Sequence, residues 1–199
     1  AVPMPMSQVV CVLNANWGEG WDQHFEQFSF TPVAAASIGQ VHFGRRKDGR
    51  QVAIKIQYPG IRRSIDSDVD NVATLLRVSG LLPKSLDIKP LLNDAKRQLR
   101  DEADYRREGA CMMQFSSLLA DAGEFVVPAM HDDLTTENIL AMTRLDGVAV
   151  ETLAHLPQAE RNRLVGLLFR LLFREIFEFR LIQTDPNFAN YRYVHSEKA

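Results

Sequence analysis

The sequence predicts an α+β fold in which a small antiparallel sheet precedes a mainly helical part. Residues 33–56 form short apolar and polar runs on either side of Asp48-Gly49, a pattern typical of a β-hairpin. The segments 61–80, 88–120 and 158–182 are predicted to be helical. A chain of 199 residues, 46% of them hydrophobic, has room for one or two lobes but not for several domains.

The composition excludes several classes of protein. The net charge of -2 gives no reason to expect a nucleic-acid partner. Neither Cys11 nor Cys111 belongs to a C-x-x-C pair and the five histidines are scattered, so a disulfide framework or a zinc site is not expected. The most apolar stretch, residues 163–182, contains six charged side chains and is therefore interpreted as a buried amphipathic helix, not a membrane span.

The remaining elements follow in order along the chain. Residues 5–16 and 21–28 have a helical pattern, so 1–30 is predicted to be a helical lead-in. The basic residues 45–50 form either a solvated hairpin tip or a contact with an anionic membrane surface. Two further strands are expected in FVVPAMHDD and NILAMTRL, and a loop with a short strand in TDPNFANYRY.

The stretch AAASIGQV, residues 34–41, aligns with the kinase Gly-rich pattern G-x-G-x-x-G-x-V, with alanine at the first two glycine positions. Glycine allows positive φ and close approach of the backbone to phosphate, so the alanine methyl groups predict a stiffer loop over a nucleotide. A small-residue packing turn is the alternative. The residues expected to contact the nucleotide here are Ala34, Ala35, Ala36, Ser37, Gly39 and Val41.

The motif VAIK ends at Lys55, where a kinase places the lysine that pairs with the α- and β-phosphates. The alternative is a strand lysine whose head reaches water. A phosphate-binding lysine needs a helical glutamate, and Glu108 is the predicted partner. Asp104 lies four residues before Glu108 on the same face of the predicted helix, whereas Glu102 projects elsewhere; a solvated charged face is the alternative for this run.

Asp185 and Asn190 have the D-x-x-x-x-N spacing of a kinase catalytic loop, in which the aspartate orients the hydroxyl proton and the asparagine holds Mg²⁺. Gln183 and Thr184 replace the usual His-Arg, and a simple turn is the alternative for this stretch. The strand ILAMTRLDG falls where a kinase hinge lies, so adenine is expected against the backbone of Met142, Thr143 and Leu145.

Taken in this order, AAASIGQV, VAIKIQYPG, DEADYRRE and QTDPNFAN resemble the UbiB/ADCK (aarF-domain-containing) family of atypical protein-kinase-like proteins, over about residues 5–193. The resemblance implies a β-rich kinase-like N-lobe at 31–145, with a helical insertion at about 60–105, and a truncated helical C-lobe at 146–199. It also implies binding of ATP or ADP with Mg²⁺, atypical kinase or ATPase activity, and support of ubiquinone (coenzyme Q) biosynthesis. A non-catalytic nucleotide-binding module that remodels a lipid-handling complex is the alternative.

The resemblance implies that Lys55 pairs with Glu108, that Glu102 and Asp104 form a regulatory E-x-D element, that Asp185 is catalytic and that Asn190 binds Mg²⁺. The family's K-x-G-Q helix and D-F-G aspartate are not found in the sequence, so the chain is expected to be a fragment and inactive by itself. The expected partners are anionic lipid or quinone-precursor membranes and ubiquinone-biosynthesis proteins. The expected location is the bacterial inner-membrane surface or the matrix side of the mitochondrial inner membrane.

Overall fold

The computed structural model describes residues 3–80, 88–182 and 190–194. The chain divides into two compact units, residues 1–144 and residues 145–199, and each is described by itself. The first unit holds the main sheet and four α-helices, and the second holds a shorter helical part with a two-stranded sheet. Within the described residues, no helix combines the length and the apolar character that crossing a membrane requires.

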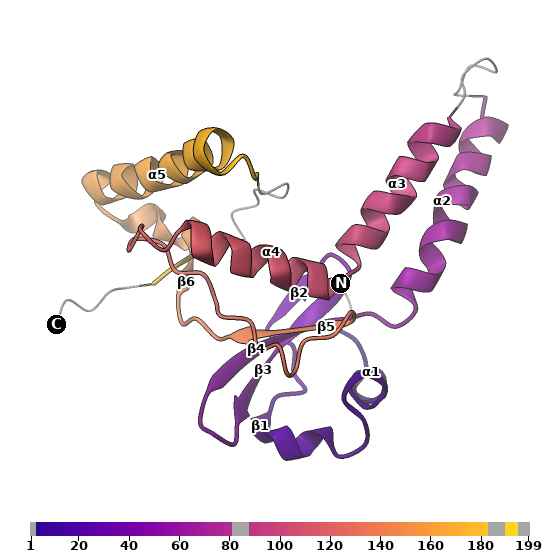
Figure 1. Ribbon diagram of the computed structural model, residues 1–199, viewed down its shortest axis with the longest axis horizontal. Coiled ribbons are helices and arrows are strands. Elements are labelled where there is room, and N and C mark those ends of the chain that lie inside the picture. Colours follow the sequence, from indigo (N-terminus) through magenta and orange to yellow (C-terminus); the bar gives the residue numbers. More distant parts are fainter. Residues whose placement is uncertain (1–2, 81–87, 183–189, 195–199) are drawn as a thin grey trace. The chain divides into compact units, whose positions relative to one another are not determined.

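The main sheet is antiparallel and has five strands (Figure 1). The strands β1 (Phe25–Phe28), β3 (Gly39–Arg46), β4 (Gln51–Gln57) and β5 (Ile139–Thr143) lie in that order, and β2 (Ala34–Ala36) pairs with β3. The predicted hairpin turn joins β3 to β4, and Gly49 in it has a φ of +86°. This left-handed conformation explains why glycine follows Asp48.

The arginines at the hairpin tip have acidic neighbours within the molecule. Arg50 binds the carboxylate of Asp48 at 2.6 Å, and Arg46 binds Asp133 at 2.5 Å. Arg45 is exposed and lies 3.0 Å from Glu26. The tip therefore presents both positive and negative side chains.

The two faces of β4 are covered by different helices. Val52, Ile54 and Ile56 are fully buried in the core that β4 forms with the helix α1 (Met6–Trp17). The intervening Lys55 points to the other face, because successive strand side chains alternate. That face lies toward α4 (Tyr105–Leu118), and Figure 1 shows α1 and α4 on opposite sides of the sheet.

The prediction of helix over 21–28 is wrong. A short 3₁₀ turn, η1 (Trp21–His24), leads directly into β1, which pairs with β3. The register shifts between Phe25 and Gln27, and this bulge lets Phe25 and Phe28 pack together with ring centroids 5.6 Å apart. Aromatic residues three positions apart normally indicate a helix face, which accounts for the error.

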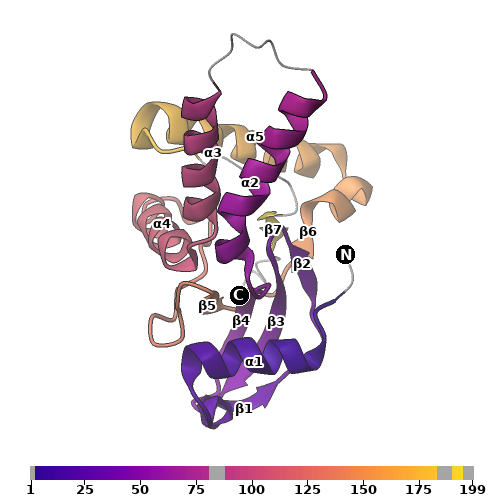
Figure 2. The ribbon, with the colours of Figure 1, turned by 90° about the vertical axis from the view of Figure 1, so that its right-hand side faces the viewer.

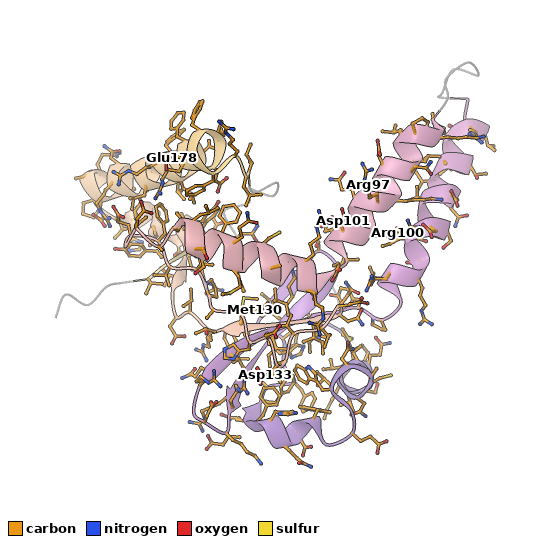
Figure 3. The ribbon with its side chains drawn as sticks, in the orientation of Figure 1. Arg97, Arg100, Asp101, Met130, Asp133 and Glu178 are labelled. Carbon is orange, nitrogen blue, oxygen red and sulfur yellow. The ribbon has the colours of Figure 1, made fainter. Side chains whose placement is uncertain are left out.

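The structure divides the predicted helical stretch 88–120 into two helices. The helix α3 (Lys89–Glu102) runs antiparallel to α2 (Ile61–Val78), and the two form the helical hairpin visible in Figure 2. Arg100 of α3, which is labelled in Figure 3, binds Asp66 of α2 at 2.5 Å. Lys96 of α3 binds Asp70 of α2 at 2.7 Å. The chain then breaks at Ala103 and Asp104 before α4 begins.

Residues 125–133 were predicted to form a strand, but among them only Met130 makes an isolated bridge, to Met142 of β5. In the second unit, α5 (Gln158–Phe173) continues as a π-helical turn, η3 (Arg174–Phe179). The helical segment therefore ends at Phe179, three residues before the end of the predicted helix over 158–182. The 3₁₀ helix η2 (Val150–His155) precedes α5. The strand β6 (Val148–Ala149) pairs with β7 (Arg192–Tyr193).

A buried polar chain ties the start of the protein to the sheet. The Met4 backbone N–H donates to Gln40 Oε1, and Gln40 Nε2 lies 2.8 Å from His42 Nε2. His42 Nδ1 lies 2.8 Å from the Ser29 carbonyl oxygen. These contacts fit a neutral imidazole that donates from Nδ1 and accepts at Nε2. Burial lowers the pKa of His42, which favours this neutral form.

This buried histidine predicts a loss of stability in mild acid. The unfolded chain binds the His42 proton at an ordinary pKa of about 6.5, whereas the folded protein binds it only at lower pH. Stability from this group is therefore complete above about pH 6.5 and decreases as the pH falls below that value. Denaturant unfolding measured between pH 8 and pH 5 should show a shallower pH dependence in His42→Gln than in the unchanged protein. Equal pH dependence in the two proteins would contradict the assignment.

Candidate functional site

The centre of the candidate site is an ion pair between the sheet and α4. Lys55 Nζ lies 2.8 Å from both carboxylate oxygens of Glu108. The lysine side chain is 18% exposed and the glutamate side chain 42% exposed. The structure thus brings together the lysine of the VAIK motif and the helical glutamate chosen from the sequence, across 53 residues of chain. The pair is open to solvent on the glutamate side.

Glu108 reaches Lys55 because α4 packs very closely on β5. A Cβ atom on Gly109 would collide with the Met130 sulfur and would lie 3.2 Å from Leu140 Cδ1. Leu140 is the cross-strand partner of Lys55, so this contact sits directly beside the ion pair. Figure 3 shows Met130 beneath α4. Gly109 was not predicted to matter, although a glycine inside a helix is a signal for close packing.

The E-x-D segment is held by backbone hydrogen bonds to the sheet region. The buried Gln57 side chain donates to the Ala103 carbonyl at 2.9 Å, and the Tyr105 N–H donates to the Glu137 carbonyl at 3.0 Å. The Asp104 carboxylate accepts from the Arg106 N–H and caps α4. These bonds fix the point at which α4 starts and therefore the direction in which it runs.

The expectation that Asp104 and Glu108 share a helix face needs correction. Asp104 precedes α4 as its N-cap residue, while Glu102 ends α3 and is exposed. The Asp104 carboxylate is used by the cap, whereas Glu108 points to Lys55. The two E-x-D acids therefore lie on either side of a break between helices, where each is positioned by different backbone.

Tyr105 is a site residue that the sequence reasoning missed. Its ring lies beneath Lys55, with Nζ 4.6 Å from the ring centroid, in cation–π geometry. The side chain is completely buried, and burial together with the neighbouring Glu108 carboxylate raises the pKa of the Tyr105 hydroxyl. Among the described residues, this hydroxyl is the one buried side-chain polar atom that has no hydrogen-bond partner. The sequence signal was a large aromatic residue within a highly charged helix start.

The alanine stretch is a regular β-hairpin. Ala34 pairs with Val41 and Ala36 pairs with Gly39, so Ser37 and Ile38 form the turn. No residue of this hairpin has a positive φ. Alanine therefore fits this backbone without strain, and the conformation itself does not require glycine.

Gly39 is required by close packing, not by an unusual backbone conformation. It is buried, and a Cβ atom there would collide with the Ile56 carbonyl oxygen and lie 3.0 Å from the Tyr105 hydroxyl. Glycine is needed because β3 approaches its neighbours too closely for a side chain. The loop is thereby fixed to the sheet at Gly39, which restricts its movement.

The hairpin, the lysine and α4 are connected across the sheet. Ala34, Val41, Lys55 and Leu140 are successive cross-strand partners on β2, β3, β4 and β5. Partners directly opposite each other project to the same face, with adjacent strands about 4.8 Å apart. Val41 thus lies beside Lys55, and the alanine strand begins one strand further along the same row.

The side chains of the predicted hinge residues Met142 and Thr143 project to opposite faces of the sheet, because they are successive residues of β5. Met142 is opposite Ala53 and shares the face of Lys55. Thr143 faces the other side, where its hydroxyl lies 3.3 Å from His131 Nε2. The Thr143 N–H donates to Ala129 and the Arg144 N–H donates to Gln51, so both donors are already used. Adenine bound at this segment would therefore have to use other backbone groups, and the adenine site itself stays a prediction.

The other predicted residues belong to the second unit. Leu145 is its first residue, and Asp185 lies outside the described residues. Asn190 is described and exposed. Within the ranges that the structure describes, no group of three or more His, Cys, Asp or Glu side chains forms a ready-made metal site.

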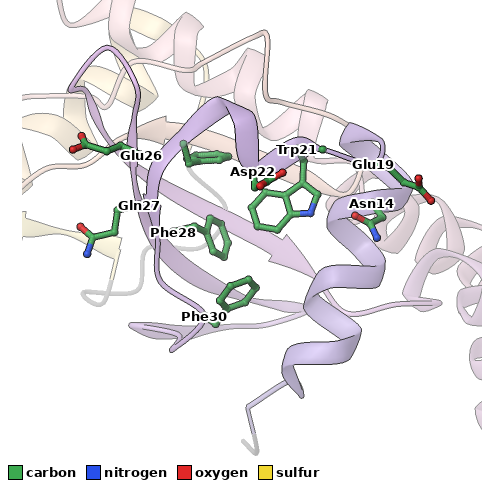
Figure 4. Close-up of a pocket in the computed structure, with 10 residues that line it drawn as sticks. Asn14, Glu19, Trp21, Asp22, Glu26, Gln27, Phe28 and Phe30 are labelled. Carbon is green, nitrogen blue, oxygen red and sulfur yellow. The ribbon is translucent and has the colours of Figure 1, made fainter.

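A cavity of about 630 Å³ lies away from these residues, between α1, η1 and β1 (Figure 4). Trp21, Phe28 and Phe30 contribute aromatic surface to it, and its acidic lining residues are Glu19, Asp22 and Glu26. Carboxylates repel phosphate, and no basic side chain lines this cavity. It is therefore a poorer phosphate site than the face that carries Lys55.

Residues 1–198 match the ABC1 atypical kinase-like domain, so the chain belongs to this family of atypical kinase-like proteins. It is 45% identical over 190 residues to "Atypical kinase COQ8B, mitochondrial" of Rattus norvegicus and 40% identical over 190 residues to "Atypical kinase COQ8, mitochondrial" of Saccharomyces cerevisiae. Both alignments cover 96% of this chain, and they span 36% and 38% of the respective relatives. The resemblance inferred from the motifs is thereby confirmed.

The fold agrees with a solved structure from the same class. A structure of Rv3197 from Mycobacterium tuberculosis, described as a complex with erythromycin, matches with a TM-score of 0.81 and 31% sequence identity. The match covers 96% of this chain and 48% of that one. The prediction of a kinase-like α+β fold is confirmed.

The close approach at Gly39 predicts a strong effect of a single methyl group. Gly39→Ala should lower the free energy of unfolding by about 1–3 kcal/mol, because β3 must move away from the Ile56 carbonyl. Gly123→Ala is the matched control, since a Cβ atom there meets nothing within 4 Å, and it should change stability by less than about 0.5 kcal/mol. Equal effects in urea unfolding would show that Gly39 is not fixed in this way.

Proposed function

We propose that this chain is part of an atypical kinase or ATPase-like protein that binds Mg-ATP or Mg-ADP and supports ubiquinone biosynthesis. The observation that carries the proposal is the ion pair between Lys55 and Glu108 on one face of the sheet. A lysine ammonium that is largely removed from water needs an acidic partner. Because Glu108 contacts the ammonium of Lys55 from one side only, the opposite side of the ammonium remains available to an anion.

The donor geometry of Lys55 favours phosphate as the further ligand. A lysine ammonium has three N–H donors, and the Glu108 carboxylate accepts from this ammonium through both of its oxygens. One donor remains for an oxygen of the α- or β-phosphate. Glu108 therefore acts as a positioning group that keeps the ammonium aimed across the site.

The alanine hairpin would cover the phosphates from above Val41. Ala34 is exposed and Ala36 is half-buried, and both small side chains lie on the face of the sheet that carries Lys55, whereas Ala35 projects to the other face. The N–H groups of this turn would then be the candidate phosphate donors. The methyl groups reduce the space near the terminal phosphate, which favours a nucleotide held tightly at its inner phosphates.

In this proposal Asp185 orients the proton of the attacking hydroxyl or water, and Asn190 binds Mg²⁺ through its side-chain oxygen. Mg²⁺ prefers oxygen ligands and would neutralise charge on the phosphates. Asn190 supplies one neutral oxygen, so a second, charged ligand is required, such as the aspartate of a D-F-G segment. Turnover is therefore best measured in a chain extended to the length of the relatives, of which this one spans little more than a third.

The relatives favour a mitochondrial location among the two that were expected. The rat and yeast proteins are both named as mitochondrial atypical kinases. We propose in addition that the protein acts on the matrix side of the inner membrane, with quinone-precursor membranes and ubiquinone-biosynthesis proteins as its partners. For a bacterial chain the corresponding place is the cytoplasmic surface of the inner membrane.

The first prediction for this function concerns the lysine. Lys55→Met should weaken Mg-ATP binding by about 10- to 100-fold, because a charge-assisted hydrogen bond to phosphate contributes roughly 1.5–3 kcal/mol. Isothermal titration calorimetry measures the dissociation constant directly. Lys96→Met is a closely matched control: Lys96 is 17% exposed and pairs with Asp70 at 2.7 Å, but on the α2–α3 hairpin.

Lys96→Met should change the dissociation constant by less than about twofold, within the ordinary effect of a remote substitution. If both substitutions weaken binding equally, the effect reflects general loss of an ion pair. If neither weakens it, Lys55 is a structural strand lysine and the proposal fails.

A second prediction concerns the alanine at the tip of the hairpin. Ala36→Gly adds backbone freedom beside Gly39 and removes a methyl group from the space near the phosphates. We expect a changed ratio of ATP to ADP affinity or the appearance of self-phosphorylation, with an unfolding midpoint close to that of the unchanged protein. Unchanged affinities together with no self-phosphorylation would indicate that the hairpin serves packing alone.

A second function, a non-catalytic nucleotide switch that remodels a lipid-handling complex, is favoured by the regular strand geometry of the alanine hairpin. Phosphate release with Mg²⁺ and membranes distinguishes the two functions. If the protein is an enzyme, Asp185→Asn in the extended chain should abolish release while nucleotide binding remains. Nucleotide binding without any release in the unchanged protein would support the switch, and release that survives Asp185→Asn would remove this residue from catalysis.

A further inference from the structure

Tyr105 occupies an unusual position for a tyrosine. It is completely buried, yet its hydroxyl has no hydrogen-bond partner within the described part of the chain. Burying a hydroxyl in this state costs free energy, so packing alone would favour phenylalanine here. Both ends of the side chain lie against parts of the candidate site.

The ring end of Tyr105 contacts the lysine. Lys55 Nζ lies 4.6 Å from the ring centroid, while its N–H groups bind Glu108. The negative face of the ring attracts the ammonium, and this attraction is stronger where water is excluded. The ring therefore supports Lys55 from below, while Glu108 holds it from the side.

The hydroxyl end of Tyr105 contacts the alanine hairpin. The position that a Cβ atom of Gly39 would occupy is 3.0 Å from this hydroxyl, which is close enough to exclude ordinary side chains. Gly39 pairs directly with Ala36 across the hairpin. The hydroxyl thus reaches the base of the loop that, in the proposed function, covers the phosphates.

The backbone of Tyr105 is fixed as firmly as its side chain. Its N–H donates to the Glu137 carbonyl, the preceding Ala103 carbonyl accepts from Gln57, and Asp104 caps the helix that follows. Three neighbouring residues are therefore tied to the sheet region or the helix start. A ring held in this way stays at a constant distance from the ammonium of Lys55.

We propose that Tyr105 is the positioning residue of the site: its ring fixes the position of the Lys55 ammonium, and its hydroxyl end packs beside Gly39 at the base of the alanine hairpin. This inference rests on the proposed nucleotide-binding function for its consequence, but the contacts exist without nucleotide. The Tyr105 side chain would then set the distance between the phosphate donors on the hairpin and the ammonium of Lys55. Movement of the E-x-D segment would shift the hairpin and Lys55 together.

The test replaces Tyr105 with phenylalanine and with its trifluoro- and pentafluoro-derivatives, which keep the ring shape and progressively weaken its negative face. Mg-ATP affinity is measured by calorimetry, and the urea midpoint is measured without nucleotide. Each measurement is made with Lys55 and in a Lys55→Met background. Tyr105→Phe keeps the ring and is the reference for the series, and pentafluorination should weaken the affinity about three- to tenfold relative to this reference when Lys55 is present.

In the Lys55→Met background the fluorine series should have no progressive effect on affinity, and its effect on the midpoint should differ from that with Lys55. The same trend in both backgrounds would show that the ring only fills space and would overturn the inference. A protein that binds no Mg-ATP at all would refute the proposed function instead, and the midpoints measured without nucleotide would still decide the role of Tyr105. If pentafluorination prevents folding, the trifluoro-derivative and a Tyr105→Leu/Lys55→Met double-mutant cycle give the same comparison.

Discussion

A positive charge on the middle of a small sheet is the constraint around which the first unit is organised. Lys55 lies on β4 between residues whose side chains are fully buried on the opposite face, and water reaches only a small part of it. A charge in this position destabilises the fold unless an acid and a polarisable surface compensate for it. Glu108 supplies the acid and the Tyr105 ring supplies the surface.

The surrounding architecture makes that compensation possible. Gly109 lets α4 approach β5, and the hydrogen bonds from Gln57 and to Glu137 determine where α4 begins. Gly39 lets β3 approach both Ile56 and Tyr105. The two glycines therefore act through close packing, and together they bring the alanine hairpin and the helical acid to the same face of the sheet. This arrangement supports the proposal that the alanine hairpin of this ABC1-family chain covers nucleotide without glycine at its first two positions.

Local signals in the sequence predicted the features that depend on short spacing. The Asp48-Gly49 turn and the VAIK alternation specify the hairpin and place Lys55 opposite the buried residues. Three errors depended on tertiary context instead. A β-bulge gave β1 the aromatic spacing of a helix, and the break at Ala103 contains neither glycine nor proline. Tyr105 and Gly109 acquire their roles from how α4 packs on β5, and their local signals, a helix glycine and an aromatic residue at a charged helix start, do not identify their partners.

The central claim is that Lys55 is the lysine whose ammonium faces the phosphates of a bound nucleotide. An acyl-phosphate derivative of ATP tests it directly, because a lysine amine placed at the phosphates attacks the acyl carbon, forms an amide and releases ATP. Peptide mass spectrometry should find the label on Lys55, with excess Mg-ATP preventing its attachment, while exposed Lys47 and Lys89 show no such protection. Labelling spread over the exposed lysines, with Lys55 unlabelled or unprotected by Mg-ATP, would contradict the account.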